Sequence, residues 1–165
     1  MIEIAVLVVA LLAAIGAGIL VRRNEGRVRT ITPRPDVPKT PGAEDDSTGT
    51  AAVSSRTALL TAAGVVAGRP AVLHFSADWC GPCAAVRRVV SAVVADLSGT
   101  PAPPLDIEVD IDANPDLARE LNVLSLPTTF VFDAAQRDLF RIAGVPKAAD
   151  LRTSLAPLTV STAAE

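Results

Sequence analysis

HFSADWCGPCAAV, which runs from His74 to Val86, holds both cysteines of the chain, its only tryptophan and its only histidine. The cysteines form the motif CGPC at residues 80–83. The run AVLHF before them is nearly all apolar, which predicts a strand buried on both faces of a sheet. After them, apolar residues recur at helical spacing: Val86, Val90, Val93, Val94 and Leu97. We therefore expect the cysteine pair at the junction of a buried strand and a helix.

This junction predicts a redox role for the pair. Cys80 would face the first amide groups and the positive end of the helix dipole, both of which favour a thiolate. Gly81 gives the loop freedom, and Pro82 fits the first helical turn without losing a needed donor. Cys83 lies one turn further along, on the inward side. We expect Cys80 to attack a substrate disulfide and Cys83 to displace the mixed disulfide that results.

Two other roles for the pair are weaker. A zinc site needs four ligands, and the chain has two cysteines and one histidine, so only an intermolecular site would be complete. A purely structural disulfide across so short a loop would stabilise little. The sequence therefore predicts no metal, and no cofactor beyond a redox-active disulfide between Cys80 and Cys83.

Composition narrows the class of protein. Half of the residues are apolar and 20 % are charged, which is typical of a chain that folds. The net charge is −3, and no basic cluster interleaves with aromatic residues, so we expect no nucleic-acid partner. Asp106, Asp110 and Asp112 alternate with apolar residues, and we interpret them as the wet face of a strand rather than as a cation site.

An uncharged apolar run, IAVLVVALLAAIGAGILV, occupies residues 4–21. As a helix it would span about 27 Å, close to the ~30 Å hydrocarbon core of a bilayer. No Lys or Arg precedes it, so we favour a retained single-pass anchor over a cleaved signal peptide. Four arginines follow it: Arg22, Arg23, Arg27 and Arg29. The positive-inside rule then places the rest of the chain on the cytoplasmic face of the cell membrane, and the extracytoplasmic orientation stays open as the alternative.

The chain divides into four parts. Residues 1–23 are the predicted transmembrane anchor helix, and residues 24–55 are a flexible linker, rich in proline and then acidic. The basic part of this linker would lie against anionic lipid headgroups or in solvent. Residues 56–158 are the predicted globular domain, and residues 159–165 are a short tail.

Within the domain the pattern predicts an α/β sandwich. A short helix that ends near residue 68 precedes the buried strand. Residues 105–112 alternate as a strand with one wet face, and a short helix capped by Asn114 follows. The segments TTFVF and DLFRIAG are close enough to form a hairpin, and a last helix covers residues 147–155.

Two separate motifs resemble the thioredoxin family. WCGPC, which begins at Trp79, is the full motif of the reducing thioredoxins. VDIDANPDLARELNVLSLPTTFVF, residues 109–132, is similar to the second half of the family, and Gly144 matches the glycine after its last strand. The resemblance covers about residues 56–158. It implies a thioredoxin fold, with a central mixed sheet flanked by helices, which here would follow the transmembrane helix and the linker.

The resemblance also implies roles for individual residues. Cys80 matches the nucleophile and Cys83 the resolving cysteine. Leu126, Pro127 and Thr128 match the cis-proline turn, whose backbone edge would pair with an extended substrate segment.

The chain departs from the family in the support of its active site. His74 stands in place of a buried aspartate that handles the proton of the inner cysteine; an imidazole titrates in the right range for this, or His74 is a core residue satisfied by a backbone group. Glu108 stands in place of a lysine beside that aspartate, so the two changes together would preserve a local pair. Arg88 replaces a proline, which predicts a straight active-site helix. Trp79 would cover the active site or act as a packing residue.

We therefore predict a membrane-tethered protein-disulfide reductase that acts on disulfide-containing proteins and receives electrons from a donor such as a reductase. One alternative is an extracytoplasmic protein for disulfide exchange or cytochrome maturation. The other is a non-catalytic thioredoxin-like binding module, which would not need either sulfur atom.

Overall fold

The computed structural model describes residues 11–16, 28–30 and 47–160 of the chain. The predicted anchor at residues 4–21 lies outside these ranges except for residues 11–16, which are helical. None of the helices within the described ranges is both long and apolar enough to cross a bilayer.

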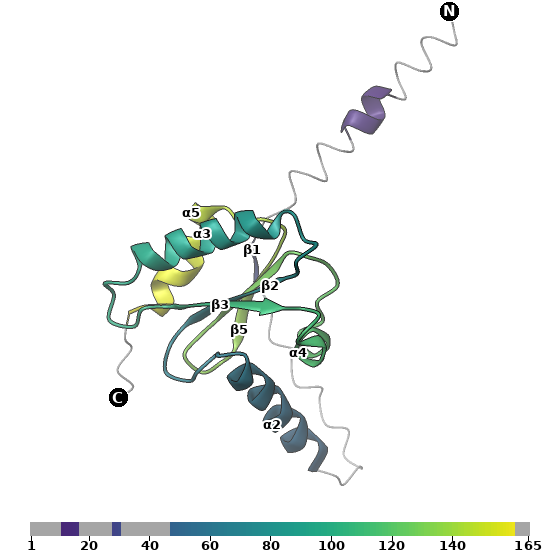
Figure 1. The fold of residues 1–165 in the computed structure, drawn as a ribbon. Helices are drawn as coiled ribbons and strands as arrows, with labels where there is room; N and C mark the ends of the chain where they lie inside the picture. Colours follow the sequence, from purple (N-terminus) through teal and green to yellow (C-terminus); the bar gives the residue numbers. More distant parts are fainter. Residues whose placement is uncertain (1–10, 17–27, 31–46, 161–165) are drawn as a thin grey trace, which may run out of the picture.

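One mixed sheet forms the centre of the domain (Figure 1). Its strands are β1 (Val28–Thr30), β2 (Ala71–Ser76), β3 (Leu105–Asp110), β4 (Thr128–Phe132) and β5 (Asp138–Ala143). They lie side by side in the order β1-β5-β4-β2-β3. β2 and β3 are parallel, and the other neighbouring pairs are antiparallel, so the mixed sheet that the resemblance implies is confirmed.

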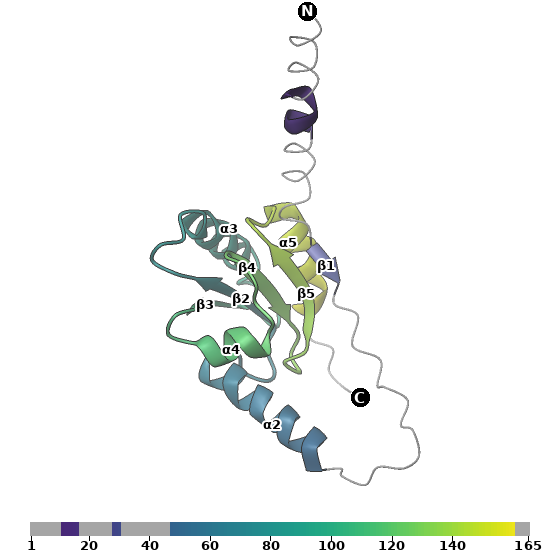
Figure 2. The same cartoon turned by 90° about the vertical axis from the view of Figure 1, so that its right-hand side faces the viewer.

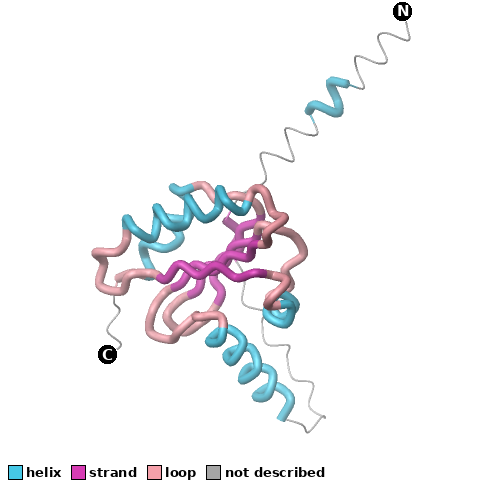
Figure 3. The backbone as a smooth tube through the Cα atoms, viewed as in Figure 1, coloured by secondary structure: helices cyan, strands magenta, loops and turns pink. Residues whose placement is uncertain are grey.

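Helices cover both faces of this sheet. They are α2 (Ser47–Ala62), α3 (Cys83–Asp96), α4 (Pro115–Glu120) and α5 (Ala148–Leu155), with a 3-10 turn at Ala156–Leu158. α3 and α5 lie on one face, and α2 and α4 lie on the other (Figures 1 and 2). Figure 3 shows the strands as the layer between the helices.

β2 is buried along its whole length, as its apolar sequence predicts. Leu73 and Phe75 project into the apolar cluster that α2 and α4 cover, whereas Val72 projects into the cluster that α3 and α5 cover. Successive side chains of a strand point to opposite faces. His74 therefore lies on the α3 face of the sheet, together with Val72.

The structure differs from the predicted flexible linker, residues 24–55, in two places. β1 lies within this range and extends the edge of the sheet, where Val28 pairs with Ile142. α2 also begins within it, at Ser47. A strand of three residues is too short to show periodicity, and the first turns of α2 contain Ser, Thr and Gly, which are weak helix formers. Pairing with β5 stabilises β1, and the later turns of α2 pack on the sheet.

Two predicted boundaries are wrong. α2 ends at Ala62 rather than near residue 68, because the chain then turns through Gly64 and Gly68, which have φ of 100° and 90°. β3 ends at Asp110, whose carboxylate accepts the amide N–H of Asp112 at 2.8 Å and turns the chain. The predicted hairpin of β4 and β5 is confirmed.

Candidate active site

Cys80 and Cys83 form a disulfide between the loop after β2 and the first residue of α3. Their Cα atoms are 5.5 Å apart. Cys83 is 1 % exposed and its Sγ lies 3.9 Å from the carbonyl oxygen of Phe75, whereas Cys80 is only half-buried. A partner in solution therefore reaches Cys80 first.

The backbone of the motif holds the two sulfur atoms together. The amide of Cys80 donates to the carbonyl of Ala77 at 3.0 Å, and the amide of Cys83 donates to the carbonyl of Cys80 at 3.2 Å. Pro82 is the N-cap of α3, and the backbone nitrogen at this position is not needed as a hydrogen-bond donor within the helix. A Cβ atom on Gly81 would meet no described atom within 4 Å, so packing does not require glycine there. Gly81 and Pro82 leave an open surface beside Cys80.

The peptide bond between Leu126 and Pro127 is cis. The amide of Gly144 donates to the carbonyl of Pro127 at 2.9 Å, and the hydroxyl of Thr128 donates to the carbonyl of Ser125 at 2.7 Å, so both sides of this turn are held. β2 and β4 are antiparallel with Phe75 opposite Thr128. The proline turn and the cysteine loop therefore leave the same end of the sheet.

Trp79 is 70 % exposed, so it is not a core residue. Its indole N–H donates to Oδ2 of Asp112 at 3.1 Å, which ties the ring to the loop after β3. Asp112 therefore has a structural partner next to the cysteines. Sequence reasoning assigned it only to the wet face of a strand.

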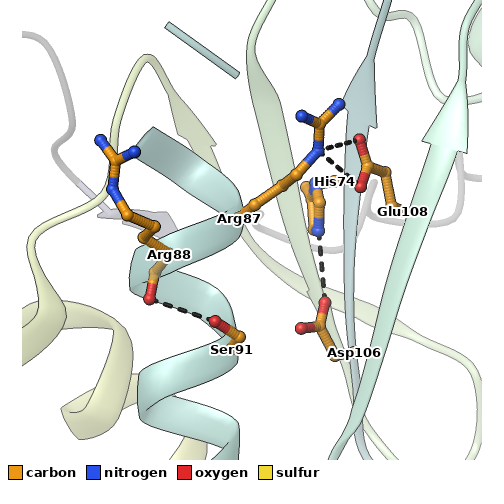
Figure 4. Close-up of a pocket in the computed structure, with 6 residues that line it drawn as sticks. All are labelled: His74, Arg87, Arg88, Ser91, Asp106 and Glu108. Carbon is orange, nitrogen blue, oxygen red and sulfur yellow. Dashed lines mark hydrogen bonds and ion pairs between the residues drawn. The ribbon is translucent and has the colours of Figure 1, made fainter. Parts of the chain in front are cut away.

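His74 is 2 % exposed and pairs with a carboxylate (Figure 4). Its Nε2 lies 3.2 Å from Oδ1 of Asp106 on β3, and its Nδ1 has no hydrogen-bond partner among the described residues. The alternative that a backbone group satisfies the ring is therefore wrong. Asp106 was not among the predicted site residues. Its position next to His74 follows from the parallel register of β2 and β3, which the sequence does not specify.

Glu108 lies directly across from His74 in this register, but its hydrogen bonds go elsewhere. Arg87 Nε donates to both carboxylate oxygens, at 2.6 and 2.8 Å. Burial alone would raise the pKa of Glu108, but hydrogen bonds from Ser76 and Arg87, and the charges of Arg87 and His74, lower this pKa below its ordinary value. His74 and Glu108 thus interact through charge, whereas their hydrogen bonds in the described structure go to other side chains: that of His74 to Asp106, and those of Glu108 to Arg87 and Ser76.

An open pocket of about 400 Å³ connects these two pairs to the surface (Figure 4). Its lining comes from α3, β2 and β3: His74, Arg87, Arg88, Ser91, Asp106 and Glu108. Arg88 extends from α3, which continues through this position without interruption. The pocket exposes the carboxylate of Asp106 to solvent, and the buried imidazole reaches the pocket through its hydrogen bond with this carboxylate.

A comparison with family models matches the thioredoxin model at residues 62–156, more than half of the chain. A thioredoxin of Mycolicibacterium smegmatis is 41 % identical over 64 residues, which are 39 % of this chain and 56 % of that protein. A bifunctional thioredoxin reductase/thioredoxin of Mycobacterium leprae is 37 % identical over 86 residues, 51 % of this chain and 18 % of that protein.

The crystal structure of chloroplastic thioredoxin z aligns with a TM-score of 0.49 and 26 % identity, over 63 % of this chain and 88 % of that one. The chain spans about half the length of the mycolicibacterial thioredoxin and a smaller share of the bifunctional protein. On the match to the family model, the chain belongs to the thioredoxin family.

Proposed function

We propose that this protein reduces disulfides of other proteins by dithiol–disulfide exchange, and that residues 4–21 hold it at a membrane. The observation that carries the exchange chemistry is the pairing of an accessible Cys80 with a buried Cys83 at the start of α3. The turn formed by Leu126, Pro127 and Thr128, at the same end of the sheet, supplies a backbone edge for the substrate.

The exchange takes place in two displacements. The thiolate of Cys80 attacks one sulfur atom of a substrate disulfide, which forms a mixed disulfide and releases the other substrate sulfur as a thiolate. The thiolate of Cys83 then attacks Sγ of Cys80, which forms the Cys80–Cys83 disulfide and releases the second substrate sulfur. The substrate gains two electrons and two protons. A donor of the thioredoxin-reductase type, the activity named in the bifunctional relative, would reduce the pair again.

Cys83 has to lose its thiol proton before the second displacement. His74 lies on the face of the sheet that α3 covers, and its ring is held by Asp106 at the inner end of an open pocket. We assign to His74 and Asp106 the removal of this proton and its passage to solvent. Arg87 and Glu108 line the same pocket.

Location and direction of the reaction are also part of the proposal. The uncharged run at residues 4–21 supports a single-pass anchor, and the arginines after it support a domain on the cytoplasmic face. In that compartment the cysteine pair would be kept reduced, which suits a reductase.

The midpoint reduction potential of the full chain tests the direction. We expect a value near that of thioredoxin, about −270 mV, rather than that of protein disulfide isomerase, about −180 mV. A value at the isomerase end would overturn the reductase assignment and favour an oxidant outside the cytoplasm. Flotation of the full chain with lipid vesicles tests the anchor, and a chain that lacks residues 4–21 is the control.

A further inference from the structure

β1 begins at the end of the sheet that carries the active site. β1 and β5 are antiparallel with Val28 opposite Ile142, and β5 and β4 are antiparallel with Ala143 opposite Thr128. Val28, the first residue of β1, therefore lies at the end of the sheet where Pro127 precedes Thr128. The cysteine loop leaves β2 at this same end.

The chain between the apolar run and β1 is short. Only residues 22–27 separate Val21 from Val28, and a fully extended chain over this interval reaches about 25 Å at most. A free linker over residues 24–55 would instead reach about 110 Å at full extension. The pairing of β1 with β5 therefore shortens the tether several-fold.

Exposed apolar side chains lie on the apolar run and in two loops of the domain. Leu11 and Leu12 on the helical residues 11–16 are each 62 % exposed. In the domain, Trp79 is 70 % exposed beside Cys80, and Leu124, in the loop that leads to the cis peptide bond, is 81 % exposed. Exposed apolar side chains that gather on one surface indicate a site that meets another apolar surface. Trp79 follows β2 and Leu124 precedes β4 at the end of the sheet where the cysteine loop and the proline turn lie, whereas Val66 and Val160 are exposed apolar residues elsewhere in the described domain.

We propose that β1 holds the active-site end of the domain toward the bilayer, so that the substrates are disulfides in the membrane-proximal segments of other membrane proteins. This inference rests on the proposed anchor and on the proposed exchange reaction. Trp79 and Leu124 would contact apolar residues of the substrate segment beside its disulfide. Confinement to the same membrane raises the effective concentration of such disulfides. Disulfides that lie far from the bilayer are beyond the reach of the short tether.

The test uses the full chain, reduced beforehand and freed of reductant, in lipid vesicles. Two single-span reporter peptides each carry one disulfide, either directly beside the bilayer or behind a polyproline spacer of about 60 Å. We expect the near reporter to be reduced about tenfold faster than the far reporter, because effective concentration falls steeply when a tether cannot span the distance. Equal rates for the two reporters would overturn the inference.

A variant that detaches β1 makes the test specific. Val28→Pro, Arg29→Pro and Thr30→Pro together remove every backbone donor of β1, and alanine at the same three positions is the matched control because it keeps them. After detachment, the tether would run from the apolar run to Ser47, where α2 begins, and it would reach about 90 Å at full extension. We expect the proline variant to reduce both reporters at similar rates and the alanine variant to keep the preference. An unchanged preference in the proline variant would overturn the role of β1.

Two readouts separate this inference from the proposals on which it rests. If the vesicle-bound protein does not reduce a small soluble disulfide, the exchange reaction itself fails. If the protein does not float with the vesicles, the anchor fails, and the inference fails with it. If both readouts succeed and the near reporter has no advantage, only the orientation of the active site is wrong.

Discussion

Nε2 of His74 lies 3.2 Å from Oδ1 of Asp106, on the neighbouring parallel strand. The histidine is buried and the carboxylate is partly exposed, so the pair connects the interior under α3 with the open pocket. A carboxylate partner fixes the orientation and tautomer of an imidazole. Asp106 therefore determines which way the ring of His74 presents its second nitrogen.

Replacement of His74 should slow the second displacement rather than the first. If His74 removes the proton of Cys83, His74→Ala should lengthen the lifetime of the mixed disulfide about a hundredfold, the lower end of what general acid–base catalysis contributes. Asp106→Asn should have a smaller effect in the same direction, because the ring remains but loses its orienting partner. Rapid-quench trapping of the mixed disulfide measures both lifetimes. Ser91→Ala, at the wall of the same pocket, is the control, and equal lifetimes in His74→Ala and in the unaltered protein would exclude the assigned role.

The ion pair of Arg87 and Glu108 should make stability depend on pH. The pKa of Glu108 is lower in the folded protein than its ordinary value of 4.5, so its stabilising contribution is fully present above pH 4.5 and is lost as the pH falls through the lower folded value. Glu108→Gln should therefore reduce the free energy of unfolding at neutral pH and make little difference at the acid end. Urea denaturation at several pH values measures this. Asp116→Asn, which breaks the highly exposed pair with Arg119, should change stability little at any pH.

The hydrogen bond between Trp79 and Asp112 should restrict the indole ring. Because Trp79 is the only tryptophan, intrinsic fluorescence reports on this ring alone. Asp112→Ala should increase the fast component of its anisotropy decay and lower the rate with protein substrates more than the rate with a small disulfide. Asp78→Ala, at the exposed neighbour of Trp79, is the control. If the two variants behave alike, the hydrogen bond does not position the ring.

Phe130 should contribute strongly to the stability of the domain. It is 1 % exposed and packs edge-on against Phe75 at a centroid distance of 6.3 Å. Phe130→Ala should lower the free energy of unfolding by about 3–5 kcal/mol, because it removes buried apolar surface and leaves a cavity. Val66→Ala, at an exposed site, should cost far less. A loss below about 1 kcal/mol for Phe130→Ala would mean that the core closes around the cavity.

Local pattern was enough to predict the central elements of the fold. The apolar run that contains Leu73 predicts the buried strand β2, and the spacing of Val86 and Val90 predicts α3. β1 could not be predicted in this way, because three residues carry no period and only the pairing of Val28 with Ile142 makes them a strand. A strand at the sheet edge is thus decided by tertiary contacts.

In the candidate site too, local pattern identifies some residues but not their partners. The WCGPC motif and Pro127 identify the cysteine pair and the turn beside it. The partners of His74 and Glu108 depend on the register of β2 and β3 and on how α3 lies over them, which no local pattern encodes. Asp106 and Arg87 were therefore missed, although each forms a direct contact with a predicted residue.

A trapping experiment with full-chain variants tests the exchange mechanism itself. In Cys83→Ala, Cys80 still attacks a substrate disulfide, but nothing displaces the product, so covalent complexes with protein substrates should accumulate and disappear on addition of reductant. Cys80→Ala should form none under the same conditions, because its remaining cysteine is buried. Complexes through Cys80 alone would support the proposed reductase. If Cys83→Ala forms no covalent complex and still binds the same partners, the domain is a docking module and the proposed exchange reaction is wrong.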